Sequence, residues 1–452
     1  GCATAVAEGQ VVHVFSEKAL EARKGVLEML LLNHPLDCPI CDQAGECELQ
    51  DYTFQEGRAD SRYREAKRFN PVEDFGGDVL YTPNRCILCT RCVRFMDDIH
   101  HEAVLNVSER GDRAYIGRAT DAGLTQPWAG NVVDLCPVGA LLSKDFLNKA
   151  RAWELDRTAS VCTGCSQGCN VTLELRDDQV VRIRPRGNAA VNTFFMCDHG
   201  RLDYRWMNRQ DRLQVPMVSG EAVDWEVALA AAAKALKGKH AYVVASASLS
   251  NEAFYLLKRL IAKTGGAVHF RVPQGYEAPL PGVPDLALRA DRAANANGAE
   301  LLGFDRSGNP LGGPKAGDVL IVVDEDLAAL PPEAVGLFDA VIVIGTAMPN
   351  HVTAPAVVLP IANVAEEEGT LTNLRGRVQR YLQAKAAPGL ARPAWFALQG
   401  LLNAVGDTAE FHSAGAVFEA LAAAEKPFAG MSYDALALTG VEVAGAHAGA
   451  AA

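Results

Sequence analysis

The second half of the chain alternates continuous apolar runs with stretches of helical periodicity. The apolar runs are bounded by turn residues and lie at 241–246, 267–272, 318–324, 339–345 and 356–362. Runs of this kind are typical of strands that are buried on both faces, because neither face then needs polar residues. The pattern predicts a parallel sheet that is covered by helices, of which 251–265 is one.

Helices are also predicted elsewhere along the chain. Residues 17–32 have apolar residues at helical spacing, and Pro35 beyond them disfavours a helical conformation at the residue that precedes it. Residues 224–237 begin with Asp224, a favourable N-cap, and continue with strong helix formers. We expect a further helix over 141–155.

Three other segments have patterns of their own. Residues 170–187 contain two short β-rich runs around the polar turn 176–179, which predicts a hairpin. Residues 52–80 are polar with weak periodicity, and we expect a connecting segment there. The Ala- and Gly-rich end at 441–452 is expected to be a flexible tail.

Length and charge exclude some classes of function. The chain has 452 residues, enough for two to four domains. Its net charge of −12 disfavours a nucleic-acid surface, which usually needs a basic face. No apolar run reaches the roughly 18 residues of a membrane-spanning helix, although attachment to a membrane through a partner stays open. The opening "GCATAV" lacks an initiator Met, and we expect a longer parent chain.

The cysteines fall into groups whose spacing is typical of metal sites rather than disulfides. There are twelve, and only Cys2 stands alone; the groups are Cys38, Cys41 and Cys47, then Cys86, Cys89, Cys92 and the more distant Cys136, then Cys162, Cys165, Cys169 and the more distant Cys197. Four thiolates in a tetrahedral arrangement suit either Zn²⁺ or an iron–sulfur cluster.

The second group follows the spacing of bacterial ferredoxins. That pattern continues with a fourth cysteine and a proline, but Met96 occupies the expected position and the Cys-Pro pair is found at Cys136–Pro137. The group therefore predicts one [4Fe–4S] cluster held by four cysteines. Structural zinc sites more often pair two C-x2-C elements, which leaves the third nearby cysteine without a role.

For the other two groups of cysteines, zinc is a more serious alternative to an iron–sulfur cluster. In the third group Gly168 eases the backbone around a bulky cofactor, and four thiolates again fit a [4Fe–4S] cluster. The first group has only three thiolates, and His34 could supply a fourth ligand or could simply lie in a loop. Three cysteines and one histidine are also a common zinc set, so spacing alone does not decide between zinc and a cluster there.

Taken in order, these motifs resemble the large iron–sulfur subunit of respiratory complex I (NADH–quinone oxidoreductase). The resemblance rests on "LLLNHPLDCPICDQAGECELQD", "NRCILCTRCVRF" and "CTGCSQGCN" with "MCDHGR", and it covers residues 1 to about 215. It implies three [4Fe–4S] ligand sets: His34, Cys38, Cys41 and Cys47; Cys86, Cys89, Cys92 and Cys136; and Cys162, Cys165, Cys169 and Cys197. Only some bacterial members keep the last set, which is thought to stand off the main electron path. Cys2 would be the last ligand of a [2Fe–2S] cluster in a plant-ferredoxin-type domain.

The later part of the chain is similar to the molybdopterin oxidoreductases, chiefly over 354–379. In complex I this domain carries no molybdenum, so none is expected. The implied fold is α+β followed by α/β, with ferredoxin-like iron–sulfur domains before a molybdopterin-oxidoreductase-like domain that has a parallel sheet. The expected divisions are the [2Fe–2S] domain end (1–16), the His-containing [4Fe–4S] segment (17–78), the ferredoxin-like domain (79–155), a small β-rich [4Fe–4S] domain (156–214), the α/β domain (215–440) and the tail (441–452).

The resemblance implies an electron-transfer role without a substrate site on this chain. Electrons would pass from an NADH- and FMN-binding subunit through the clusters toward quinone, within a proton-translocating complex. The implied partners are the flavin subunit and further iron–sulfur subunits, with membrane contact only through partners. The implied location is the cytoplasmic side of the bacterial inner membrane or the mitochondrial matrix side.

Two alternatives remain open at this point. The alpha subunit of an NAD-linked molybdenum formate dehydrogenase shares the same cluster array. No cysteine follows Cys197, however, and His199 stands where such enzymes usually have lysine. A zinc-stapled scaffold is the other alternative.

Three further stretches are expected to have no direct role. The Gly-rich 303–318 lacks a nucleotide-binding spacing, and 181–187 is expected to be a solvated strand face. The acidic triplet Glu366–Glu368 is expected on a solvated surface.

Overall fold

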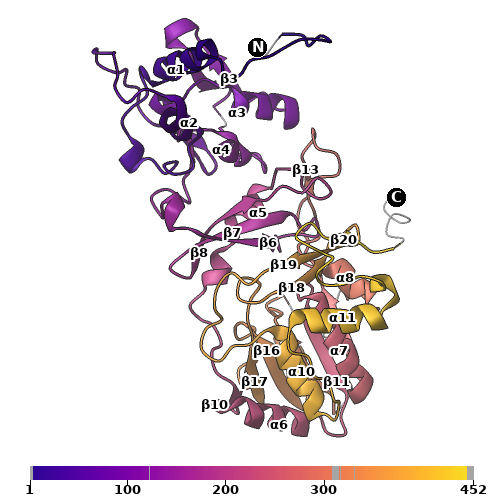
Figure 1. Cartoon of the computed structure of the whole chain (residues 1–452). Coiled ribbons are helices and arrows are strands. Elements are labelled where there is room, and N and C mark those ends of the chain that lie inside the picture. Colours follow the sequence, from indigo (N-terminus) through magenta and orange to yellow (C-terminus); the bar gives the residue numbers. More distant parts are fainter. Residues whose placement is uncertain (1–3, 122, 308–314, 316, 330, 445–452) are drawn as a thin grey trace. The chain divides into compact units, whose positions relative to one another are not determined.

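The computed structural model describes residues 4–121, 123–307, 315, 317–329 and 331–444. Cys2, the end of the expected tail, and most of the central part of the Gly-rich 303–318 lie outside these residues. The chain divides into two units, Gly1–Leu155 and Asp156–Ala452, and each is considered by itself (Figure 1).

The first unit consists of short elements joined by the loops that carry cysteines. Strands β1, β2 and β5 form one antiparallel sheet, and β3 pairs with β4. The elements are α1 (Glu17–Leu31), η1 (Cys38–Ile40), α2 (Glu48–Glu56), β1 (Glu73–Gly76), β2 (Val79–Tyr81), η2 (Pro83–Arg85), α3 (Arg91–Arg94), the π-helix η3 (Phe95–Ile99), β3 (Leu105–Ser108), η4 (Gly111–Arg113), β4 (Tyr115–Arg118), α4 (Asn131–Leu135), β5 (Leu141–Ser143) and η5 (Ala152–Glu154).

The first predicted helix is confirmed as α1. The side chain of Ser16 accepts a hydrogen bond from the Ala19 N–H, which satisfies one of the free donors at the helix start. The prediction of a connecting segment over 52–80 is wrong in part. That range contains the end of α2, all of β1 and most of β2.

The predicted helix over 141–155 is wrong. Its first residues form β5, where Leu141 lies opposite Tyr81 of β2, so the sheet satisfies the backbone groups that a helix would have used. Leu141 and Leu142 are both buried by this pairing. Asn148 has a φ of 62°, a left-handed conformation that an α-helix does not contain.

Within the described residues, the second unit contains a large mixed sheet with covering helices, two three-stranded sheets and one two-stranded sheet. Its elements are β6 (Asp156–Val161), β7 (Asn170–Arg176), β8 (Gln179–Pro185), α5 (Asp198–Leu202), η6 (Arg205–Asn208), β9 (Met217–Val218), β10 (Glu221–Ala222), α6 (Trp225–Leu236), β11 (Ala241–Ser246), α7 (Asn251–Thr264), β12 (Ala267–Arg271), β13 (Ala278–Pro279), β14 (Ala287–Leu288), α8 (Ala296–Leu301), β15 (Val319–Val323), α9 (Pro332–Val335), β16 (Ala340–Gly345), β17 (Val357–Pro360), β18 (Gly369–Thr372), β19 (Arg377–Tyr381), α10 (Ala394–Ala404), α11 (Ala414–Ala424), η7 (Lys426–Phe428) and β20 (Val441–Glu442).

The predicted hairpin is confirmed as β7 and β8. Its two turn residues, Asp177 and Asp178, have φ values of 51° and 59°. Two successive positive φ values are the mark of a type I′ turn, whose twist matches that of the flanking strands. The hairpin joins β6 to form one three-stranded sheet, and β18, β19 and β20 form the other.

The predicted parallel sheet is confirmed, and it is longer than expected. All five apolar runs are strands, and the sheet has seven strands in the order β10-β9-β17-β16-β15-β11-β12. Strands β12, β11, β15, β16 and β17 run parallel, whereas the two-residue strands β9 and β10 add an antiparallel edge. Every residue of β15 is buried, which explains its unbroken apolar sequence.

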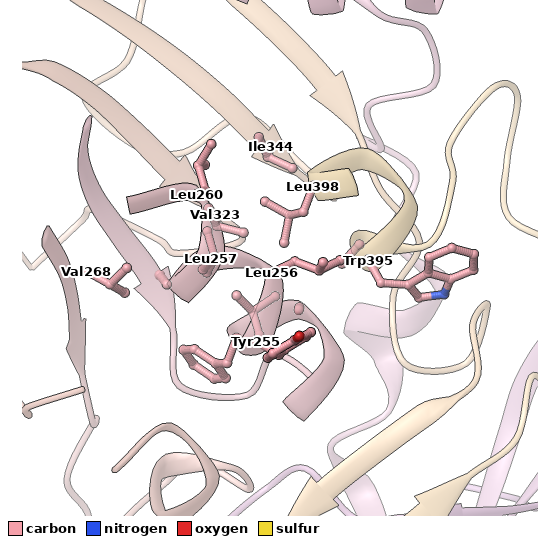
Figure 2. Packing of buried hydrophobic residues seen from close by; sticks show 14 of the residues in the cluster. Tyr255, Leu256, Leu257, Leu260, Val268, Val323, Ile344, Trp395 and Leu398 are labelled. Carbon is pink, nitrogen blue, oxygen red and sulfur yellow. The ribbon is translucent and has the colours of Figure 1, made fainter. Parts of the chain in front are cut away.

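Side chains alternate between two hydrophobic clusters on the two faces of this sheet. Val323 and Ile344 belong to the cluster that includes Leu256 and Leu260 of α7 and Leu398 of α10 (Figure 2). The neighbouring strand positions belong to a second cluster, which includes Leu320, Val322 and Val335. Each buried aliphatic side chain contributes about 1.5–3 kcal/mol to folding, so the two faces together anchor the second unit.

The strand order reverses between β11 and β15. From β11 the chain moves through α7 to β12 at one edge, and then returns to place β15 on the other side of β11. In open parallel sheets, the crevice beside such a reversal, at the carboxyl ends of the strands, is where ligands usually bind. None of the helices within the described ranges has the length and apolar character needed to span a membrane.

Candidate metal centres

The Cys86 set, made of Cys86, Cys89, Cys92 and Cys136, lines a single cavity in the first unit. Cys86 follows η2, Cys92 lies in α3, and Cys136 ends α4. The backbone between them adopts left-handed conformations at Leu88 and Thr90, with φ values of 54° and 62°. These turns wrap the loop around the cavity, so thiols that lie up to 50 positions apart in sequence face the same space.

Burial favours the protonated thiols of Cys92 and Cys136 when no metal is bound. Burial, reinforced by the neighbouring thiols of Cys136 and Cys86, raises the pKa of Cys92 to about 12. Burial raises the pKa of Cys136 to about 11, while the N–H groups of Leu141 and Ala140 act in the opposite direction. The N–H of Leu88 donates to Cys86 Sγ at 3.4 Å. Buried thiols with N–H groups aimed at the sulfur fit a cluster, which binds thiolates and displaces their protons.

The Cys38 set comprises Cys38, Cys41 and Cys47. Cys38 begins η1, and Cys47 stands at the start of α2. Burial raises the pKa of Cys41 and of Cys47, and the thiols of Cys38 and Cys41 contribute to the shift at Cys47. The three thiols therefore lie close enough to influence one another.

The Cys38 and Cys86 sets are held side by side within the first unit. Asp37, which precedes Cys38, accepts a hydrogen bond from Arg85 Nε at 2.9 Å, and Arg85 precedes Cys86. Glu48 follows Cys47 and pairs with Arg91 at 2.8 Å.

Two backbone contacts bring the same loops together. The Glu48 N–H donates to the carbonyl of Pro137 at 3.0 Å. Gly139 is so near the first set that a Cβ there would lie 2.1 Å from Cys41 Sγ, so any larger residue would displace that thiol.

His34 lies near the Cys38 set in sequence, and its imidazole has the features of a neutral ligand. Its Nδ1 is buried and has no hydrogen-bond partner. Burial lowers the pKa of His34, and the positive charges of Lys67 and Arg85 lower it further. A neutral imidazole with a free ring nitrogen is the form that binds metals.

The Cys162 set, made of Cys162, Cys165, Cys169 and Cys197, lies in the second unit between β6, the β7–β8 hairpin and α5. Cys162 follows β6 and its N–H donates to the Cys169 carbonyl at 2.8 Å. Cys197 caps α5, where its sulfur accepts a hydrogen bond from the Gly200 N–H. A Cβ at Gly200 would lie 2.7 Å from Cys162 Sγ and 3.7 Å from Cys197 Sγ, so this position leaves no room for a side chain between the two sulfurs.

Burial dominates the electrostatics of this set as well. It raises the pKa of Cys197 to about 12, with a further contribution from Cys165. It also raises the pKa of Cys162 and of Cys169, each of which is influenced by the other members of the set. Gly168 has a φ of 60°, as expected for a glycine that turns the loop.

In the described part of the chain, no group of three or more His, Cys, Asp or Glu side chains is arranged to hold a single metal ion. A cluster does not need such convergence, because each thiolate binds a different iron atom. The donor sets therefore fit iron–sulfur clusters by their chemistry, burial and N–H groups.

A separate cavity of about 360 Å³ lies in the second unit at the reversal of strand order. Residues that follow β11, β15 and β17 line it, among them Ser248, Asp324 and Ile361. His199, the residue two positions after Cys197, also lines it, and none of its lining residues is a cysteine.

The expected surface position of the acidic triplet is wrong for Glu366 and Glu367, whereas the side chain of Glu368 is 38% exposed. Glu366 and Glu367 are buried. Glu366 forms an ion pair with Arg212 at 2.6 Å, and Glu367 accepts hydrogen bonds from Tyr381 and the Ala394 N–H. These partners are remote in sequence, so the triplet itself gave no sign of burial.

The expectation of a solvated face over 181–187 is also wrong for Arg182. Its guanidinium is largely buried and pairs with the buried carboxylate of Glu174 on the adjacent strand β7.

Models of four families match parts of the chain. The NADH-ubiquinone oxidoreductase-G iron-sulfur binding region matches 23–62, and the ferredoxin-like domain of NADH-quinone oxidoreductase subunit 3 matches 76–142. The molybdopterin oxidoreductase Fe4S4 domain matches 155–209, and the molybdopterin oxidoreductase family matches 324–404. The matches follow one another in the predicted order.

Curated relatives are subunits of the same type of enzyme. The G subunit of the NADH-quinone oxidoreductase of Rickettsia felis is 39% identical over 271 residues, which cover 58% of this chain and 40% of the relative. The G subunit of the Pseudomonas fluorescens enzyme is 37% identical and covers 60% of this chain and 30% of the relative. Subunit 3 of the Thermus thermophilus enzyme is 38% identical over 257 residues and covers 52% and 32%. The chain thus spans less than half the length of these relatives.

Among solved structures, the NAD⁺-reducing [NiFe]-hydrogenase in the H2-reduced state has a TM-score of 0.28. It is 28% identical and covers 30% of this chain and 59% of that one, a likeness too weak to support any inference. The sequence relatives and the family models confirm the predicted resemblance: the chain is similar to the G subunits of NADH-quinone oxidoreductases.

Proposed function

We propose that this chain carries electrons through iron–sulfur clusters within an NADH–quinone oxidoreductase. The observation that carries the proposal is the convergence of Cys86, Cys89, Cys92 and Cys136 on one buried cavity. When bound there, a [4Fe–4S] cluster supplies a one-electron redox centre. The chain buries Cys92 and Cys136 and directs the Leu88 N–H at the sulfur of Cys86.

The ligand sets follow from the resemblance and from local chemistry. Cys86, Cys89, Cys92 and Cys136 would hold one cluster, and Cys162, Cys165, Cys169 and Cys197 another. Cys38, Cys41 and Cys47 would hold a third together with His34, whose buried Nδ1 lacks a hydrogen-bond partner. Cys2 would be one ligand of a [2Fe–2S] cluster.

Adjacency of the first two sets supports an electron relay. The ion pairs Asp37–Arg85 and Glu48–Arg91 join residues that neighbour the ligands in sequence. Such pairs fix the two loops relative to each other, and a fixed short separation is what electron tunnelling needs. By the resemblance, the Cys162 set would stand off this relay.

The partners and the location belong to the same proposal. The named relatives are subunits of a multi-subunit enzyme. By analogy, this chain would receive electrons from a flavin- and NADH-binding subunit and pass them to further iron–sulfur subunits toward quinone. It would act at the cytoplasmic side of a bacterial inner membrane, or on the mitochondrial matrix side, and would touch the membrane only through partners.

Metal analysis of the anaerobically purified chain tests the proposal. We expect about eight to twelve iron atoms per chain, with matching acid-labile sulfide, for two to three [4Fe–4S] clusters. A colourless protein loaded with zinc would refute the proposal in favour of a scaffold. One molybdenum atom per chain would favour the formate dehydrogenase alternative, with the cavity beside His199 as its site.

A further inference from the structure

A buried phenol lies beside the Cys86 set. Tyr81 is the last residue of β2 and is 1% exposed. Its side chain lines the cavity that the four cysteines also line. The ring of Phe75 packs against it with 4.4 Å between ring centroids, which restricts where the hydroxyl group can point.

The Tyr81 hydroxyl lies between a backbone donor and the sulfur atoms of the cavity. It accepts a hydrogen bond from the backbone N–H of Ile116, in β4, at 3.3 Å. Tyr81 and Cys86 line the same cavity, and each shifts the pKa of the other. Because the N–H of Ile116 can only donate, the single phenolic proton is left for another acceptor. The phenol is therefore placed to donate to the sulfur of Cys86.

The pKa shifts of the two side chains have the signs expected for a phenol beside a thiol. Burial raises the pKa of Cys86, whereas the hydrogen bonds from the Leu88 N–H and from Tyr81 lower it. Burial also raises the pKa of Tyr81, and the contact with Cys86 raises it further. A donor that stabilises a thiolate has these two effects, since it favours the charged sulfur and holds its own proton more tightly.

This donor differs from those at the other cysteines in a way that permits a test. The sulfur of Cys197 accepts a hydrogen bond from the backbone N–H of Gly200, which no side-chain substitution removes. The Tyr81 hydroxyl can be removed while the ring stays, by substitution with phenylalanine.

We propose that Tyr81 is a positioning residue that donates a hydrogen bond to the Cys86 ligand and thereby raises the reduction potential of the cluster held by the Cys86 set. The proposal rests on the proposed function, because it requires a cluster at this set. A reduced cluster carries one more negative charge than an oxidised one, so its thiolate ligands are stronger acceptors. The hydrogen bond therefore stabilises the reduced state more than the oxidised state.

The test compares midpoint potentials by redox titration of the cluster-loaded full chain, followed by EPR. In Tyr81→Phe, the ratio of reduced to oxidised cluster at a fixed potential should fall by about tenfold, which is a shift of about 59 mV to more negative potential for one electron. The control is Tyr115→Phe, which removes the hydroxyl of a tyrosine in β4 that is 39% exposed, and its titration should match the wild type. An unmoved or more positive midpoint in Tyr81→Phe would overturn the proposal.

Tyr81→Phe also removes the hydrogen-bond acceptor of the Ile116 N–H. A second variant that keeps the hydroxyl group separates this effect from the proposed one. Placing 3-fluorotyrosine at residue 81 keeps the ring and makes the hydroxyl a stronger donor, so the midpoint should move to more positive potential. A shift in the same direction as Tyr81→Phe would overturn the proposal. The titrated signal is assigned by its loss in Cys92→Ser. Absence of any such signal from the wild type would refute the cluster itself, whereas a signal with unmoved potentials would refute only the role of Tyr81.

Discussion

Replacing Glu367 by glutamine should remove a pH dependence from the stability of the second unit. Glu367 is 7% exposed. Its carboxyl group accepts hydrogen bonds from the Tyr381 hydroxyl at 2.8 Å and from the Ala394 N–H at 2.9 Å. Burial raises the pKa of Glu367 to about 8, and the neighbouring carboxyl of Glu252 contributes to the shift. The group is therefore neutral at pH 7.

The sign and the size of the predicted pH dependence follow from this pKa shift. The ordinary pKa of a glutamate is 4.5, so the unfolded chain releases the proton that the folded chain keeps until about pH 8. Between these values the folded state binds more protons, and the free energy of unfolding falls as pH rises, by up to about 1.4 kcal/mol per pH unit. The stabilisation is fully present below pH 4.5 and is lost through about pH 8. From about pH 6 to about pH 8, Glu367 should account for a loss of about 2 kcal/mol.

Urea unfolding at about pH 6, 7 and 8 measures this loss. Pulsed hydrogen exchange of peptides from β18 and α10 assigns the unfolding to the second unit. Glu367→Gln should flatten the pH dependence relative to wild type, because glutamine does not titrate. Glu368→Gln is the control: its side chain is 38% exposed and it should keep the wild-type slope. Equal slopes in wild type and Glu367→Gln would refute the reasoning.

Three further changes have distinct expected outcomes. Arg212→Met should destabilise the second unit by about 3–5 kcal/mol in urea unfolding, because it leaves the buried carboxylate of Glu366 with only the more distant ammonium of Lys385, at 3.6 Å; a loss under about 1 kcal/mol would contradict this. His34→Cys should keep a cluster but alter its midpoint potential, since a charged thiolate replaces a neutral imidazole, and an unchanged midpoint and EPR signal would show that His34 is not a ligand. Cys165→Ala should remove one cluster signal while NADH–quinone activity of the assembled complex largely survives, and complete loss of turnover would place the Cys162 set on the electron path.

The local sequence pattern predicted the structure correctly where burial constrains the residue types at consecutive positions. Strands buried on both faces must be apolar throughout, and for this reason all five parallel strands were predictable. The hairpin was predictable because the aspartates of its turn tolerate positive φ. Cysteine spacing also joined Cys136 to a group 44 positions away, and the structure brings that residue to the same cavity.

The local sequence pattern gave wrong predictions where the structure of a segment depends on a residue that is distant in the sequence. Residues 141–143 were predicted as helix because the pairing with β2 is not encoded locally. The acidic triplet was predicted at the surface because Arg212, the counter-ion of Glu366, is 154 positions away. Tyr81 and Gly139 belong to no sequence motif. Only the folded structure places them next to the sulfur atoms of cysteines.

The central claim is that the Cys86 set holds a [4Fe–4S] cluster beside a second one. The most direct measurement is the EPR spectrum of the dithionite-reduced chain, compared with that of Cys92→Ser. The account predicts that one [4Fe–4S] signal disappears in the variant while the signal from the Cys38 set remains. An identical spectrum in the two proteins, or no iron signal in either, would contradict it.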